Sequence, residues 1–101
     1  MLPDISHLQF FVLAALMNGG ELYGRELRDR LRQEGVKRSR AAFYQLMSRL
    51  EEADLVTGRY REQSIEGIKI RQRSYRISVD GCGVVNNVID FYNNQIHLSL
   101  E

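Results

Sequence analysis

The sequence predicts a mainly α-helical fold with a small β-hairpin: three helices, a two-stranded hairpin and a final helix. Apolar residues recur at helical spacing in four segments of the 101-residue chain. Between residues 56 and 78 the composition changes to β-branched residues, arginine and tyrosine, which favour strands. Glycines and helix-capping residues separate these segments, so the elements have defined starts and ends.

The first helix is predicted to begin after Ser6 and to end at Gly19-Gly20. Ser6 with Gln9 three residues later is the pattern of a capping box, in which each side chain bonds the other residue's backbone N–H. Apolar residues cover almost the whole circumference of this helix. We therefore expect it to be buried centrally or shared with a second subunit.

Two further helices are predicted, from about Tyr23 to Glu34 and from Ser39, as the N-cap, to about Ala53. The third helix has one apolar face, formed by Phe43, Leu46, Met47 and Leu50. At ~100° per residue, its polar side chains then point outward. Val56 to Ser64 and Ile68 to Ser78 are predicted to form an antiparallel hairpin, joined by Ile65-Glu66-Gly67.

Helical periodicity returns from about Gly83 and predicts a last amphipathic helix of about 16 residues. Three helices followed by a hairpin are the element order of a winged helix-turn-helix, whose third helix enters the major groove of DNA. Other small α+β domains share this order. On this interpretation residues 1–80 form a DNA-binding domain, and residues 81–101 form a C-terminal dimerisation helix in the same compact unit.

Charge is distributed unevenly along the chain. All 14 lysine and arginine residues fall between Arg25 and Arg76, together with eight of the 13 acids, which gives this window a net charge of +6. The two flanks together carry −5. A cationic middle segment indicates a polyanionic partner, namely double-stranded DNA; a set of solvated helix faces is the alternative.

The third helix offers the side chains expected of a recognition helix. Basic residues cluster at its N-terminus, where the helix dipole and free N–H groups already attract phosphate. Glutamine can read adenine and arginine can read guanine, while serine and tyrosine can bond phosphates. The residues predicted to bind DNA here are Arg38, Ser39, Arg40, Tyr44, Gln45, Ser48 and Arg49. The alternative is a solvated face behind an ordinary cap.

The hairpin adds a second basic surface. Its two short strands carry six lysine and arginine residues, and only two acids, Glu62 and Glu66, offset their charge. A wing along the DNA backbone or in the minor groove uses such charges through counterion release. Edge protection is the alternative, because exposed sheet edges often carry lysine and arginine. The wing residues predicted to bind DNA are Arg59, Arg61, Lys69, Arg71 and Arg73, and the sixth basic residue of the hairpin is Arg76.

The last helix carries almost no charge and must bury its apolar stripe. Dimerisation is the favoured explanation, because a two-fold operator needs a two-fold protein. Packing against the first helix of the same chain is the alternative. The residues predicted at the dimer interface are Phe10, Val85, Val88, Ile89, Tyr92 and Ile96.

Over residues 8–92 the chain resembles the PadR-like transcription regulators. The segments that carry the resemblance are residues 10–16, 22–27, 39–51, 55–56, 75–77 and 80–81. The resemblance implies a homodimer of the compact branch, which binds an inverted-repeat operator, represses transcription and is released by a small aromatic effector. Two positions depart from the family pattern: Ala41-Ala42 replaces Gly-Thr before the recognition tyrosine, and Asp54 replaces a glycine.

No catalytic, metal or cofactor site is predicted. His7 and His97 are far apart in sequence and cannot build a metal site with the single cysteine, Cys82. The lone cysteine and the lack of an apolar span or secretion signal predict a cytoplasmic protein with no membrane association. Two other functions stay open at this stage: a winged-helix module that binds proteins instead of DNA, and a small-molecule carrier.

Overall fold

The computed structural model describes residues 2–100, with only the backbone for residues 97–100. Within this range the helices are α1 (His7–Gly19), α2 (Gly24–Gln33), α3 (Arg40–Glu52) and α4 (Val79–Leu100). The strands are β1 (Leu22–Tyr23), β2 (Val56–Ile65) and β3 (Ile68–Ile77), which form an antiparallel sheet in the order β1-β3-β2. The predicted fold class, a mainly α winged helix with a C-terminal helix, is confirmed.

Two helices begin where the local sequence predicts. Ser6 Oγ accepts the N–H of Gln9 at 3.1 Å, and Gln9 Oε1 accepts the N–H of Ser6 at 2.9 Å. The expected capping box is therefore confirmed. Ser39 caps α3, because its Oγ accepts the N–H of Ala42 at 3.1 Å.

The strand β1 was not predicted from the sequence. Leu22 and Tyr23 pair with Tyr75 and Ser74 of β3, so the expected two-stranded wing is part of a three-stranded sheet. Tyr23 was instead expected at the start of the second helix. Two residues are too few to show the period of a strand, and their partners lie far along the chain.

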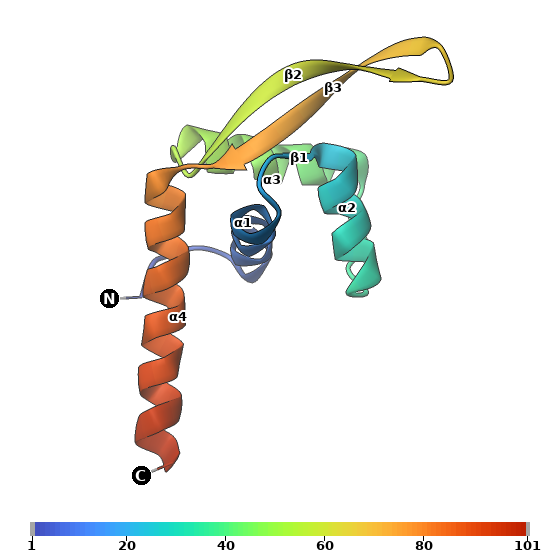
Figure 1. Cartoon of the computed structure of the whole chain (residues 1–101). Helices are drawn as coiled ribbons and strands as arrows, with labels where there is room; N and C mark the ends of the chain where they lie inside the picture. Colours follow the sequence, from blue (N-terminus) through green and yellow to red (C-terminus); the bar gives the residue numbers. More distant parts are fainter. Residues whose placement is uncertain (1, 101) are drawn as a thin grey trace.

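The hairpin of β2 and β3 has ten residues in each strand. Its turn is shorter than predicted, because Ile65 pairs with Ile68 and only Glu66 and Gly67 connect the strands. Both connecting residues have positive φ, 52° and 79°, as tight two-residue hairpins require. The strands run past β1 into a long projection (Figure 1).

The last helix starts earlier than predicted, at Val79, and runs for 22 residues. Ser78 caps it, since Ser78 Oγ accepts the N–H of Gly81 at 2.9 Å and donates to the carbonyl of Asp54 at 2.7 Å. A Cβ on Gly81 would collide with the carbonyl oxygen of Leu55. This glycine, which weakens the helical signal in the sequence, allows α4 to approach the start of the hairpin. The expected domain boundary at residue 80 falls inside α4.

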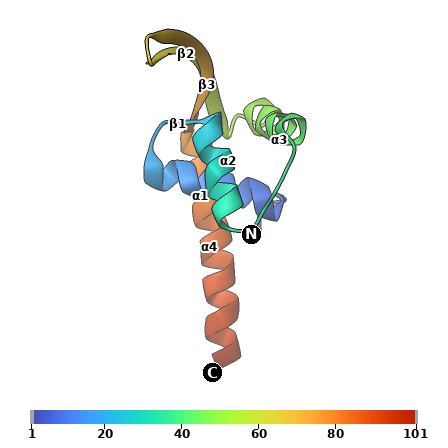
Figure 2. The same cartoon turned by 90° about the vertical axis from the view of Figure 1, so that its right-hand side faces the viewer.

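The core lies where α1, α2, α3 and the base of the hairpin meet. Its buried residues are Val12, Leu13, Leu16, Leu22, Leu27, Leu31, Phe43, Met47, Leu50, Val56, Tyr75 and Val85. The molecule is elongated, with extents of 59 × 27 × 22 Å. Figure 2 shows why: the C-terminal half of α4 projects beyond the other elements on the side away from the hairpin. None of the described helices combines the length and apolar character needed to cross a membrane.

Candidate nucleic-acid interface

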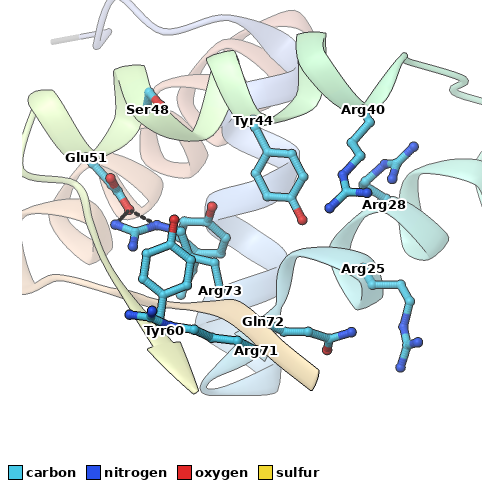
Figure 3. A pocket seen from close by; sticks show the side chains of 11 residues that line it. Arg25, Arg28, Arg40, Tyr44, Ser48, Glu51, Tyr60, Arg71, Gln72 and Arg73 are labelled. Carbon is cyan, nitrogen blue, oxygen red and sulfur yellow. Dashed lines mark hydrogen bonds and ion pairs between the residues drawn. The ribbon is translucent and has the colours of Figure 1, made fainter. Parts of the chain in front are cut away.

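A cationic groove of about 660 Å³ lies between α2, α3 and the hairpin (Figure 3). Its lining residues are Arg25, Arg28, Arg40, Tyr44, Ser48, Glu51, Tyr60, Arg71, Gln72, Arg73 and Tyr75. Five of these are arginines, and the single acid, Glu51, pairs with Arg73. The other four arginines form no ion pair with any carboxylate in the part of the chain that the structure describes. The groove therefore presents unneutralised positive charge.

One flank of α3 forms a wall of this groove. Arg40, Tyr44 and Ser48 follow at four-residue spacing and therefore share that flank. The Arg40 guanidinium lies 5.8 Å from the centroid of the Tyr44 ring, and Tyr44 packs edge-on against buried Phe43 at 5.1 Å. Gly24 of α2 makes room for it, since an added Cβ would lie 2.7 Å from the Tyr44 hydroxyl oxygen. Tyr44 is thus half-buried at the groove.

The opposite flank of α3 holds the other predicted recognition residues. Arg38, Gln45 and Arg49 line a smaller cavity of about 280 Å³ that the start of α1 also borders. All three side chains are exposed, and Arg38 donates to the carbonyl oxygen of Lys37 at 3.0 Å. The seven predicted residues therefore divide between two flanks of α3, with Ser39 engaged in capping the helix.

The strand register of the hairpin places its lysine and arginine side chains on two different faces. Side chains alternate along a strand, and residues opposite each other share a face. Arg73 stands opposite Tyr60, whereas Arg59 stands opposite Ser74. The face toward the cationic groove, which we call the groove face, carries Lys69, Arg71 and Arg73. The other, the outer face, carries Arg59, Arg61 and Arg76.

On the outer face a single carboxylate holds two arginines. Glu21, between α1 and β1, accepts hydrogen bonds from Arg59 Nε at 2.7 Å and Nη2 at 3.0 Å. It also accepts from Arg61 Nη1 at 2.8 Å and from the Ser74 hydroxyl at 3.3 Å. The hydrogen bond from Arg59 lowers the pKa of the Glu21 carboxyl, although burial acts in the opposite direction. We call these four residues the outer ion-pair network.

On the groove face, Arg73 forms an ion pair with Glu51. Its Nη2 and Nε donate to Glu51 Oε1 at 2.8 and 3.3 Å, and this inner ion pair links α3 to β3. The guanidinium carbons of Arg71 and Arg73 lie 4.6 and 4.8 Å from the centroid of the Tyr60 ring. Lys69 and Arg71 have no ion pair with a described acid.

The residues predicted at a dimer interface differ in depth along α4. Val85 and Val88 are only 1% and 7% exposed and pack inside their own chain. Ile89, Tyr92 and Ile96 are 42%, 53% and 58% exposed. The apolar stripe of α4 therefore serves two purposes: its first half completes the core of the chain, and its second half remains uncovered.

An apolar cavity of about 480 Å³ lies beside the uncovered part of α4. Leu2 and Phe10 line one wall, and Ile89 and Tyr92 line the other. Phe10 is half-buried, whereas Leu2 is exposed. The exposed apolar surface of α4 thus continues onto the N-terminal segment.

Six groove residues were not among the predicted DNA-binding residues, and three of them, Arg25, Arg28 and Tyr60, add cationic or aromatic side chains to the groove. Arg25 and Arg28 are three residues apart on α2, and Figure 3 shows both on the α2 side of the groove, with Arg28 beside Arg40. Their spacing was visible in the sequence, but a basic helix face is equally typical of plain solvation. The position of Tyr60 depends on the strand register, which the sequence does not define.

A family model of the PadR-like transcriptional regulators matches residues 12–85. The chain belongs to the PadR-like family. The match runs from α1 into α4 and so contains the cationic groove and both faces of the hairpin. PadR-like proteins are transcriptional regulators, and the family is not defined by an enzymatic activity. No curated protein sequence matched the chain.

Solved structures of PadR-like proteins share the fold. A PadR family transcription regulator from Clostridium difficile R20291 gives a TM-score of 0.74 at 16% identity, over 95% of this chain and 100% of that one. RV1404 from Mycobacterium tuberculosis gives 0.72 at 23% identity, over 96% and 60%. Bacillus subtilis PadR, solved in complex with operator DNA, gives 0.67 at 18% identity, over 83% and 47%. At these identities the likeness establishes the winged-helix fold.

Proposed function

We propose that this PadR-like regulator is a cytoplasmic homodimer that binds double-stranded DNA and represses transcription from an inverted-repeat operator. The cationic groove carries the proposal. When a recognition helix lies in the major groove and a wing in the adjacent minor groove, the intervening phosphodiester strand passes between them. Four arginines without acid partners surround that space here, and neutralising phosphates releases counterions.

On this proposal α3 lies in the major groove. Arg40, Tyr44 and Ser48, on the flank toward the wing, contact the strand in the cationic groove. Gln45 and Arg49 are exposed on the other flank and have the side chains that read adenine and guanine through paired hydrogen bonds. The first group then supplies affinity, and the second supplies sequence preference.

The wing contributes through its groove face. Lys69 and Arg71 form no ion pair with a described acid, although Glu62 stands opposite Arg71, and both lie along the projecting part of the hairpin, so we propose them as contacts to the backbone or the minor groove. Arg25 and Arg28 of α2 line the same cationic groove as Arg71. Arg73 borders the same groove while its guanidinium remains on Glu51.

The uncovered half of α4 supports the dimer. Ile89, Tyr92 and Ile96 lie at helical spacing on one stripe, and a second copy of the chain would cover them across a two-fold axis. The apolar cavity between the N-terminal segment and α4, about 480 Å³, falls in the size range of small-molecule sites. We propose it as the place for a small aromatic effector.

Selection of bound fragments from genomic DNA, followed by gel shifts at increasing salt, tests the proposal. Arg40→Ala and Arg71→Ala are each expected to reduce the slope of log affinity against log salt by about one. Arg32→Ala is the matched control, because it removes the same charge from an exposed pair with Asp29 outside the groove. Equal losses for all three variants, or no binding to any fragment at low salt, would contradict the proposal.

Sedimentation of the full chain tests the dimer separately. Tyr92→Asp places a charge in the uncovered stripe and is expected to shift a dimer toward the monomer, whereas Asn86→Asp, on another exposed part of α4, is not. A wild-type chain that sediments as a monomer at micromolar concentration would contradict the dimer. Failure to bind DNA together with capture of a protein partner would favour an interaction module.

A further inference from the structure

We propose that Glu21 is a positioning residue of the wing, because its carboxylate fixes the angle at which the hairpin leaves the domain. Its effect on DNA affinity rests on the proposed function, whereas its effect on the hairpin does not. The outer ion-pair network carries the inference: one carboxylate receives three guanidinium hydrogen bonds from Arg59 and Arg61 and a fourth bond from Ser74.

The hairpin loses its third strand close to this network. β1 pairs with β3 at two positions only, the second being Tyr23 opposite Ser74. After Tyr23 the chain turns into α2, whereas β2 and β3 remain paired to the turn at Glu66 and Gly67. Residues 60–73 therefore have no strand from β1 beside them, and Figure 1 shows this part extending past β1. The angle of a two-stranded ribbon without a third strand then depends on side-chain contacts, here those of Glu21 on the outer face and of Arg73 with Glu51 on the groove face.

Glu21 holds the hairpin at that point and just beyond it. Arg59 stands opposite Ser74, where the third strand ends, and Arg61 is two residues further into the two-stranded part. The carboxylate reaches across β3 to hold both arginines of β2, and its side chain is only 17% exposed. Arg61 also lies 5.7 Å from the centroid of the Tyr23 ring. The contact therefore spans the place where the ribbon would otherwise bend.

The backbone that carries Glu21 is itself fixed to the core. Gly20 ends α1 with φ of 74°, and its N–H donates to the carbonyl of Leu16 at 3.0 Å. Leu16 is buried, and Leu22, on the other side of Glu21, is buried too. The carboxylate thus connects the most central helix to the most peripheral strand through a short, anchored segment.

A competing explanation is that Glu21 masks two arginines that bind DNA. Geometry favours positioning, because Arg59 and Arg61 lie on the outer face and neither of them lines the cationic groove. The two explanations predict opposite signs. Loss of a positioning contact weakens DNA binding, whereas loss of a mask releases two cations, tightens binding and steepens the salt dependence.

Amide hydrogen exchange of the full chain tests, without DNA, whether Glu21 holds the hairpin in place. In Glu21→Gln, exchange is expected to accelerate at residues 60–73 and to stay unchanged in the core at Leu13 and Leu50. Glu34→Gln is the matched control, since it removes one negative charge from an exposed position that forms no ion pair with a described residue. Unchanged exchange in the hairpin, or uniform acceleration including the core, would overturn the positioning role.

A double-mutant cycle on a selected DNA fragment tests the consequence for binding. Glu21→Gln is expected to weaken affinity on the order of 3- to 10-fold with the salt slope unchanged. Arg59→Gln is expected to weaken affinity less, because Arg61 still bonds Glu21 in that variant, and the double variant is expected to bind no worse than Glu21→Gln alone. Tighter binding by Glu21→Gln, or additive losses, would overturn the proposal. If the wild type binds no DNA, the proposed function fails, but the hydrogen-exchange result still shows whether Glu21 holds the hairpin in place.

Discussion

The two faces of the hairpin are attached to the domain by arginine–carboxylate pairs that differ in burial. In the inner ion pair, the side chains of Arg73 and Glu51 are 27% and 26% exposed. The Arg73 guanidinium also lies 5.9 Å from the ring of Tyr75, which is fully buried. In the outer ion-pair network, Arg59 and Arg61 are 62% and 44% exposed and Glu21 is 17% exposed, so the difference in burial lies in the arginines.

This difference shows how one kind of contact can have two effects. A partly buried charge that loses its partner is left in a poorly solvated site, so its removal destabilises the fold. An exposed guanidinium that loses its acid regains water, so the stability hardly changes and only the geometry is lost. We therefore expect changes at the inner ion pair and the buried residues beside it to destabilise the domain, and changes in the outer ion-pair network to move the wing.

The largest expected effect is at Tyr75, on the groove face. Tyr75→Ala removes a side chain that is 1% exposed and is expected to lower the free energy of unfolding by ~3–5 kcal/mol. Arg76→Ala, the next residue on the exposed outer face, is expected to change it by less than ~0.5 kcal/mol. Urea unfolding followed by circular dichroism measures both. Similar losses for the two neighbours would abolish the distinction between the faces.

A smaller loss is expected at Gly58, beneath the inner ion pair. A Cβ there would collide with Glu51 Oε1 and approach Arg73 Nη2 to 2.9 Å, so Gly58→Ala is expected to destabilise by ~1–3 kcal/mol. Gly83→Ala is the control, since nothing lies within 4 Å of its added Cβ in α4, and it is expected to stabilise by ~0.5–1 kcal/mol.

The cause of the Gly58 effect can be isolated with a second substitution. Because the collision involves the Glu51 carboxylate, part of the loss should disappear when Gly58→Ala is made in a Glu51→Ala background. The comparison uses the same unfolding measurement on all four proteins of the cycle. A Gly58→Ala loss of equal size in both backgrounds would show that the collision does not involve this side chain.

How far the sequence predicts the molecule depends on how local each feature is. The caps at Ser6 and Ser39 depend on residues within one helical turn, and both were predicted correctly. The cationic middle segment and the hairpin were also predicted, because both depend on residues that are close together in the sequence. In contrast, β1 and the outer ion-pair network join residues far apart in sequence, such as Glu21 with Arg59 and Arg61. No local pattern contains those partners.

The wing shows this limit within a few residues. In the sequence Arg59 and Arg71 look alike, since each is an arginine in a basic β-rich stretch. The strand register places them on opposite faces, and only then does Arg59 meet an acid while Arg71 meets the Tyr60 ring. A one-residue shift of register would exchange the faces. Composition can therefore predict a basic wing, but it cannot predict which of its lysine and arginine side chains form no ion pair.

A modest gain is expected at Asp54, in the turn that leads from α3 into the hairpin. Its φ of 58° is in the left-handed region, where the family resemblance places a glycine. Asp54→Gly is expected to stabilise by ~0.5–1 kcal/mol, because the side chain no longer strains the backbone. Its carbonyl would still accept the Ser78 hydroxyl. A higher melting temperature checks the prediction, and a lower one would mean that the aspartate side chain itself stabilises the turn.

The smallest expected effect is the response of the outer face to acid. The pKa of Glu21 is lowered in the folded chain by the hydrogen bond from Arg59. Its contribution is therefore fully present above the ordinary pKa of an unfolded glutamate and is lost as the pH falls through the lower, folded value. Because both arginines are largely exposed, the global stability should hardly register this loss.

The arginine side chains themselves should report the transition. The Nε–H NMR signal of Arg59, which donates to Glu21 at 2.7 Å, is expected to shift toward the position of a solvated guanidinium as the pH is lowered through the acidic range. In Glu21→Gln the signal should already be close to that position and stay there. A transition that persists in Glu21→Gln would assign the titration to another acid. Movement of the distal hairpin in step with the wild-type signal would show that the carboxylate charge, rather than the packing of residue 21, holds the wing.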